Sequence, residues 1–142
     1  MKRSLTTIGL LTVLTVCLCP SLRAQGRSVY LFGVTTNFSD SVAYVTPVQR
    51  LDSVVLAKGT GFLTGRSLYS AQLKQFTERA LGRQHDVPAV FFDKSQAAVE
   101  KKRQKVLHHL QKEKDYYVKE LASEQFRFMT VTQQQLIEHG HQ

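Results

Sequence analysis

Two short segments of this chain are apolar on successive residues rather than on alternate ones. Residues 29–34 read Val-Tyr-Leu-Phe-Gly-Val, and residues 87–92 read Val-Pro-Ala-Val-Phe-Phe. Such runs are typical of strands that other elements cover on both faces, whereas a strand with one solvated face alternates apolar and polar residues. The two runs therefore predict a sheet of which each face is covered at least in part.

Helical periodicity follows in residues 68–81. Their apolar side chains recur at i, i+4, i+7 and i+11 and form one stripe: Tyr69, Leu73, Phe76 and Ala80. Ser67 is the expected N-cap, and Gly82 is the expected stop at the C-terminal end. We interpret the two aromatic residues of the stripe as core side chains, since an aromatic stripe at this spacing is more often buried than ligand-binding.

A second helix is predicted over residues 94–112, with Asp93 and Gln96 in a spacing that resembles a capping box. One face of this helix is apolar: Val99, Val106, Leu107 and Leu110. At about 100 degrees per residue, Arg103 lies in the middle of that face. An arginine in this position reaches past its neighbours to water, pairs with a carboxylate, or receives an anionic ligand.

Three further strands complete the predicted order. Residues 42–45 follow a turn rich in Asn, Ser and Asp and form a hairpin with the first strand, and residues 116–121 and 126–128 supply the last two. The order is ββαβαββ, which predicts a single small α/β domain with a mixed sheet and two packed helices. We expect residues 87–92 at its centre, with both helices on one face or on opposite faces according to the direction of the strand order.

Residues 47–66 show no convincing periodicity, although residues 54–56 could form a short strand, and they contain Gly59, Gly61 and Gly65. A connection of this length is either an undetected element or a binding loop. It differs from a phosphate-binding loop, because Thr60 stands where that motif has its first glycine and Arg66 where it has lysine. What remains is a helix start at which backbone amides and Arg66 can bind an anion.

The N-terminus has the parts of a secretory signal peptide. Lys2 and Arg3 precede an uncharged stretch with a short apolar centre, and Ala24 follows as a small residue at the cleavage position. We predict a signal peptide over residues 1–24, an α/β domain over 25–131 and a flexible tail over 132–142. The alternative is an uncleaved membrane anchor, but the apolar centre is shorter than the roughly 18–20 residues that span a bilayer.

Cleavage would change both the cysteine count and the charge. Cys17 and Cys19 lie in the predicted signal peptide, so the mature chain would contain no cysteine. The net charge is +8, and loss of Lys2, Arg3 and Arg23 would leave 16 basic and 11 acidic residues, a net charge of +5. An exported chain without a base-reading motif is not expected to bind nucleic acid. A basic surface there favours solubility or contact with anionic glycan or lipid.

Each class of catalysis lacks one necessary residue. His139 and His141 lie near Glu138 in the tail, where nothing orients them for a physiological metal site. His85 and Asp86 form a candidate catalytic pair before a strand. The sequence offers this pair neither a serine in a nucleophile elbow nor a cysteine in the mature chain.

Several short segments together resemble a group of short exported proteins found in Bacteroidetes: residues 29–34, 37–41, 60–66, 69–73 and 126–128. This resemblance covers nearly the whole predicted mature chain. It implies export and a compact α/β domain, and it implies no catalytic residue.

We therefore expect an exported, non-catalytic binding or interaction module of the cell envelope, located in the periplasm or outside the cell. Its partner is an envelope protein or an anionic ligand, with no cofactor, no metal and no stable membrane insertion after cleavage. The expected ligand-binding residues are Gly65 and Arg66 at the helix start, with Arg127 or Arg103 as a second cationic contact. One alternative is a small hydrolase that uses His85 and Asp86. The other is a purely structural subunit, which predicts a large exposed apolar patch on the sheet.

Overall fold

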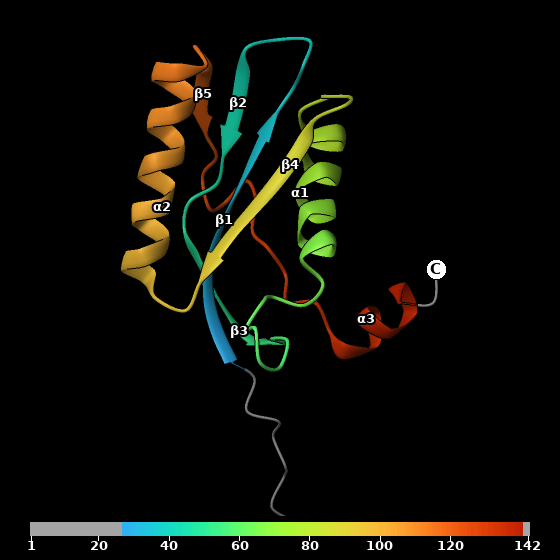
Figure 1. Cartoon of the computed structure of the whole chain (residues 1–142). Helices are drawn as coiled ribbons and strands as arrows, with labels where there is room; N and C mark the ends of the chain where they lie inside the picture. The colour runs from blue at the N-terminus through green and yellow to red at the C-terminus, as the bar shows by residue number, and fades with distance from the viewer. Residues whose placement is uncertain (1–26, 141–142) are drawn as a thin grey trace, which may run out of the picture.

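The computed structural model describes residues 27–140, which form one domain around a five-stranded mixed sheet (Figure 1). The elements are β1 (Arg27–Thr36), β2 (Val42–Val45), β3 (Gln49–Val54), α1 (Arg66–Ala80), β4 (Val87–Asp93), α2 (Gln96–His108), a π-helical turn η1 (His109–Glu113), β5 (Tyr117–Glu120) and α3 (Gln133–His139). The predicted α/β class, with a mixed sheet and two packed helices, is confirmed. The predicted signal peptide, with Cys17 and Cys19, and also His141 lie outside the described residues.

The long strand β1 is the centre of the sheet. It pairs antiparallel with β4 along one side, from Thr36 opposite Val87 to Tyr30 opposite Asp93. On its other side it pairs antiparallel with β2 and β3, and β5 lies parallel to β2. The expectation that residues 87–92 are central is wrong, because β1 separates β4 from every other strand and leaves it at an edge.

The two long helices cover opposite faces of this sheet (Figure 1). Strands β3 and β4 both run antiparallel to β1, so α1 crosses from β3 to β4 in one direction and α2 returns from β4 to β5. Right-handed crossovers in opposite directions place their helices on opposite faces. Alternate residues of β1 serve the two cores, with Leu31 on the α1 side and Phe32 on the α2 side.

Strand β3 is the element that the sequence did not predict. Strand β2 ends before Pro47, as expected, and β3 follows after a one-residue shift in the register to β1. Thr46 bridges the irregularity, since the Gly33 N–H donates to its Oγ1 over 2.8 Å and its own N–H donates to the Gly33 carbonyl over 2.9 Å. Only Leu51 and Val54 of β3 are buried, so the strand carries no regular alternation.

The glycine-rich segment folds as a small hairpin. Leu56 and Leu63 pair as an antiparallel bridge, and the Ala57 N–H donates to the Phe62 carbonyl over 2.8 Å. Gly59 at the tip has a φ of 83°, in the left-handed region that glycine adopts without strain. Residues 47–66 are therefore a strand and a hairpin rather than a long irregular loop.

Both long helices begin at caps other than the expected ones. Helix α1 starts at Arg66 with Gly65 as its N-cap, ahead of the predicted Ser67. The N-cap of α2 is Ser95, whose Oγ accepts from the Ala98 N–H over 3.4 Å. Asp93 accepts from the Ser95 N–H over 3.2 Å and so fixes the turn before that cap.

The last predicted strand, residues 126–128, is not a strand. The expected alternation is present, since Phe128 is buried against α1 and Arg127 is exposed. However, the side-chain amide of Gln49 bonds both the N–H and the carbonyl of Phe128 over 2.8 Å. Gln72 does the same for the next residue along the chain. Side chains thus occupy the backbone groups that a neighbouring strand would use.

The predicted flexible tail contains helix α3. Thr132 and Gln135 form a capping box, with the Thr132 N–H donating to the Gln135 Oε1 over 2.9 Å. Leu136 packs against the core on the α1 side, which holds the short helix to the domain. Among residues 27–140, no helix has the combination of length and apolar character needed to cross a bilayer.

Thr35 provides a test of the packing of β1. It is fully buried, and its Oγ1 has no hydrogen-bond partner in the described part of the chain. Thr35→Val should raise the free energy of unfolding by about 1 kcal/mol in urea denaturation, because it removes an unpaired buried hydroxyl. Thr77→Val is the control, since the buried Thr77 hydroxyl donates to the Lys74 carbonyl over 3.0 Å and its loss should destabilise. Equal effects of the two changes would contradict this account.

Candidate functional site

A hollow of about 410 Å³ opens between the tip of the glycine-rich hairpin and the end of β4. Its lining comes from the hairpin, the first residue of α1, the end of β4, the turn after β4 and one residue of α2: Thr60, Gly61, Phe62, Arg66, Phe91, Phe92, Asp93, Lys94 and Lys102. We call it the β4 hollow. A volume of this size suits a small ligand or one part of a larger one.

The topology explains why the β4 hollow lies here. Strands β3 and β4 run in the same direction, so their carboxyl ends lie at the same end of the sheet. From there the chain leaves toward α1 on one face and toward α2 on the other. Alpha/beta proteins commonly bind ligands in such a crevice, where the loops after two parallel strands lead to opposite faces of the sheet.

The β4 hollow is cationic. Arg66, Lys94 and Lys102 line it, against the single carboxylate of Asp93. Lys102 Nζ lies 2.9 Å from Asp93 Oδ2, and this contact holds the pKa of Asp93 below its usual value of 3.8. Lys94 Nζ lies beside Gly61, 3.4 Å from the position that a Cβ would take there. Within residues 27–140, the Lys94 ammonium makes no hydrogen bond or ion pair, so it is available to an anion.

The guanidinium of Arg66 is held by one hydrogen bond, and its terminal nitrogens have no partner among the described residues. Its Nε donates to the Val90 carbonyl over 2.9 Å, which fixes the guanidinium beside β4. Its two Nη atoms bond no other group of the described residues. A guanidinium held in this way presents its terminal nitrogens in a fixed plane, which suits a carboxylate or phosphate group.

Gly65, which we expected to bind ligand beside Arg66, has a structural role. Its φ is 72°, and a Cβ at this position would lie 2.3 Å from Leu136 Cδ2. Both the backbone conformation and the close approach of α3 therefore require glycine. Gly65 does not line the β4 hollow.

Arg103 pairs with a carboxylate, which is one of the three uses expected for it. Its Nη2 lies 2.6 Å from Glu120 Oε2, and its Nε donates to the Thr46 carbonyl over 3.0 Å. Only 13% of its side chain is exposed. It lines a separate hollow with Lys101 and Glu120, so the structure does not bring it together with Arg66.

Arg127 is exposed and lies in the irregular segment after β5. It lines three other hollows together with Phe126, two of which also include Ser123, and none of the three includes Arg66 or Arg103. The structure therefore places neither Arg127 nor Arg103, the two candidates for a second cationic contact, in the hollow that Arg66 lines.

Sequence reasoning missed two lysines and one aromatic residue of the β4 hollow. In the sequence, Lys102 stands in a run of charged residues that is typical of a solvated helix face, and no motif singles out Lys94 or Phe62. Two signals were present: Lys94 directly follows a buried strand with its turn-forming Asp93, and Phe62 is an aromatic residue next to a turn glycine. Its exposure of 63% is high for phenylalanine.

His85 and Asp86 do not form a hydrogen-bonded pair among the described residues. Asp86 is buried, and its carboxylate accepts from Arg83 Nε over 3.0 and 3.1 Å and from Asn37 Nδ2 over 2.8 Å. His85 is exposed on a turn with a φ of 66°. The hydrolase alternative requires the carboxylate to orient the imidazole, but here it orients an arginine.

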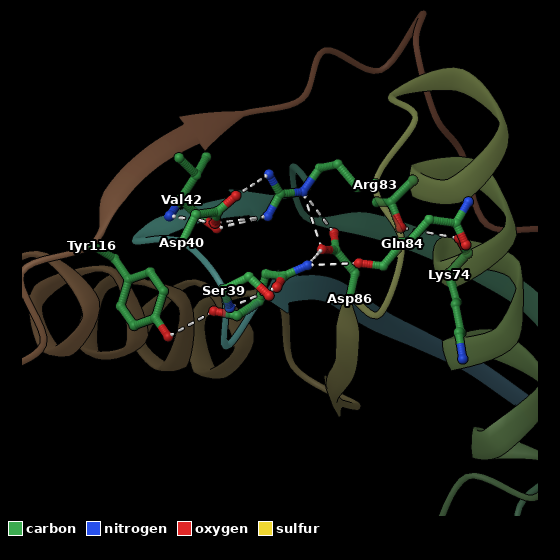
Figure 2. A network of polar contacts seen from close by, with 10 residues as sticks. Ser39, Asp40, Val42, Lys74, Arg83, Gln84, Asp86 and Tyr116 are labelled. Atoms are coloured by element: carbon green, nitrogen blue, oxygen red, sulfur yellow. Dashed lines mark hydrogen bonds and ion pairs between the residues drawn. The ribbon is translucent and has the colours of Figure 1, made fainter.

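Arg83 joins two loops through this network (Figure 2). Its Nη1 lies 3.0 Å from Asp40 Oδ2, so the guanidinium spans Asp86 after α1 and Asp40 after β1. It also lies over the Tyr44 ring, 5.1 Å from the centroid. The hydrogen bond from Arg83 holds the pKa of Asp40 below 3.8. The contribution of Asp40 to stability is therefore present above about pH 4 and is lost as the pH falls through the lowered value.

No family model, curated protein or solved structure matches the chain. The resemblance to short exported proteins of Bacteroidetes therefore stays a prediction. Within residues 27–140, no group of three or more His, Cys, Asp or Glu side chains is placed to hold a metal ion. The β4 hollow, with its cationic lining, is the candidate ligand site of the domain.

Proposed function

We propose that this chain is an exported, non-catalytic binding module of the cell envelope and that its anionic ligand lies in the β4 hollow. The observation that carries the proposal is the placement of Arg66, Lys94 and Lys102 around one hollow at the carboxyl ends of two parallel strands. A single carboxylate offsets their charge. Cations held close together repel one another, and an anion between them relieves that repulsion.

The lining also indicates what surrounds the anionic group of the ligand. Phe62, Phe91 and Phe92 all line the β4 hollow, and Phe62 is 63% exposed. These rings offer apolar surface beside the cations. The ligand is therefore expected to carry an apolar portion next to its carboxylate or phosphate group.

Binding without catalysis is favoured by the state of Asp93. General base catalysis needs a group that takes up a proton near neutral pH. Lys102 holds the pKa of Asp93 below 3.8, so this carboxylate is a poor base. Asp93 is the only carboxylate in the lining of the β4 hollow as the described residues define it.

Export rests on the N-terminal sequence. The basic residues Lys2 and Arg3, the short apolar stretch and Ala24 support a cleaved signal peptide. Mass spectrometry of the protein recovered from the periplasm or medium tests this part. A first residue at Gln25, within about three positions, supports export and cleavage. A chain that keeps Met1 and stays inside the cell argues against both.

Calorimetric titration with citrate and with inorganic phosphate tests the binding site. Lys94→Ala and Arg66→Gln should each weaken binding about tenfold or more, since a hydrogen bond to a charged group contributes about 1.5–3 kcal/mol. Arg127→Ala is the matched control, because it removes an exposed arginine far from the β4 hollow in the fold and should leave the affinity unchanged within about twofold. Unchanged binding in a variant that combines Lys94→Ala with Arg66→Gln, or equal loss of affinity in Arg127→Ala, would contradict the proposal.

A further inference from the structure

The outer edge of β4, on the side away from β1, runs along the β4 hollow, and its backbone groups have a defined direction. Phe92 is partly exposed at this edge, whereas Val90, whose carbonyl Arg66 bonds, is only 1% exposed. The N–H and the carbonyl of Gly33 on β1 both bond Thr46, on the side of β1 away from β4. Gly33 lies opposite Val90, so these two residues form a pair without hydrogen bonds between them. The N–H and carbonyl of Val90 therefore point outward, and those of Phe92, two residues on, do the same.

The two outward carbonyls are already bonded by cationic side chains. Arg66 Nε donates to the Val90 carbonyl over 2.9 Å, and Lys102 Nζ donates to the Phe92 carbonyl over 3.2 Å. Arg66 comes from α1 on one face of the sheet and Lys102 from α2 on the other. The neighbouring Pro88 has no N–H to offer. The bonded carbonyls and Pro88 hinder the addition of an arbitrary β-strand to this edge.

We propose that the ligand of the β4 hollow is an extended acidic peptide segment that pairs with the outer edge of β4; this inference rests on the proposed function. The incoming strand bonds the outward N–H groups of Val90 and Phe92. Its carboxylates turn the Arg66 guanidinium and the Lys102 ammonium away from the positions that they hold without ligand. This movement breaks the Arg66 contact with the Val90 carbonyl and uncovers Val90, and the two carbonyls then accept N–H groups of the peptide. A neutral strand lacks the charge to displace these cations, so the edge selects acidic sequences.

The placement of the two cations also sets the spacing of the acidic residues. Successive side chains of an extended strand point to opposite faces. Because Arg66 and Lys102 approach β4 from opposite faces, the two carboxylates belong to neighbouring residues of the peptide or to residues three apart. Two acidic residues at a spacing of two would both face the same cation.

Charge also argues against a second copy of this chain as the occupant of the edge. The predicted mature chain has a net charge of +5, and two copies paired through β4 would bring Arg66, Lys94 and Lys102 of each against the same cations of the other. Like charges placed opposite each other disfavour such a pair. An acidic segment offers the complementary charge.

Two hexapeptides with blocked ends test the inference, Val-Thr-Glu-Glu-Val-Thr and the same sequence with Gln-Gln in the middle. The Glu-Glu peptide should bind at least tenfold more tightly and slow hydrogen exchange at the Val90 and Phe92 amides at least tenfold, as measured by NMR on the mature protein. Lys102→Gln should remove most of the discrimination between the peptides. Lys105→Gln, an exposed lysine on the same helix outside the β4 hollow, should retain it.

The outcomes separate this inference from the function on which it rests. Equal affinity for the two peptides, or binding without slower exchange at Val90 and Phe92, would overturn strand addition. If citrate still binds and requires Lys94 in that case, the anion site stands and only the peptide is wrong. If neither citrate nor the Glu-Glu peptide binds, both proposals fail.

Discussion

Arg83→Ala is expected to lower the free energy of unfolding by about 3–5 kcal/mol, because it leaves a buried carboxylate without its cation. The side chain of Asp86 has no exposed surface, and Arg83 Nε bonds both of its oxygens. The same guanidinium bonds Asp40 and so ties the turn after β1 to the loop before β4 (Figure 2). Urea denaturation followed by circular dichroism measures the loss.

Two further variants make this result interpretable. Arg50→Ala breaks the ion pair with Asp52, whose side chains are both more than half exposed, and should change stability by less than about 1 kcal/mol. Adding Asp86→Asn to Arg83→Ala removes the buried charge and should restore part of the loss. If Arg83→Ala costs no more than Arg50→Ala, the network does not hold the two loops together.

Phe32→Ala should also cost about 3–5 kcal/mol, since it leaves a cavity in the core on the α2 side. Phe32 has no exposed surface and stacks on Phe91, with ring centroids 5.0 Å apart. Phe38→Ala is the matched control: Phe38 is 92% exposed in the turn after β1, and its removal should have almost no effect on stability. Denaturation of both variants under one set of conditions measures the difference.

This pair of variants tests whether β1 has cores on both faces. Phe32 contributes to the core under α2, whereas its neighbour Leu31 contributes to the core under α1. A small loss in Phe32→Ala, similar to that of Phe38→Ala, would mean that α2 does not pack on this face of β1. The opposite placement of the two helices would then be wrong.

The parts of the fold that the sequence predicts are those with continuous or periodic burial. Both faces of β1 are buried, so its apolar run is unbroken, and α1 buries the predicted Tyr69 and Leu73. Strand β3 escapes the same reasoning because only Leu51 and Val54 of its residues are buried. Ser53, with a φ of 60°, breaks its alternation as well. Strand β3 forms because it pairs with the buried strand β1, although its sequence shows no alternation of apolar and polar residues.

Contacts between distant residues explain the other differences. The alternation in residues 126–128 predicts burial correctly but not hydrogen bonding, because Gln49 reaches Phe128 from 79 positions away in the chain. The helix in the tail is held to the domain because Leu136 packs against the core beside Gly65. Neither contact leaves a periodic signal in the sequence.

The sequence indicates Arg66 as a candidate site residue but not Lys102, because the contacts of Lys102 are with residues of another element. Arg66 follows from its position at a helix start after a glycine-rich segment. Lys102 looks like one of many lysines on a solvated helix face, and only the open edge of β4 gives its ammonium a carbonyl and a carboxylate to bond. Arg103 is unusual in the sequence, yet its charge is taken up by Glu120. The position of Arg103 on an apolar helix face thus indicated a polar contact, but that contact is an ion pair with Glu120 rather than a ligand site.

Mapping an anion on the protein by NMR tests the central claim most directly. In a titration of the mature protein with citrate, the backbone amides of Gly61, Phe62, Lys94 and Ser95 should shift with a common saturating dependence, since these residues line or adjoin the β4 hollow. The amides near Arg103 and Arg127 should remain in place. Saturable shifts centred on either of those arginines, or no saturable shift at the β4 hollow, would contradict the account.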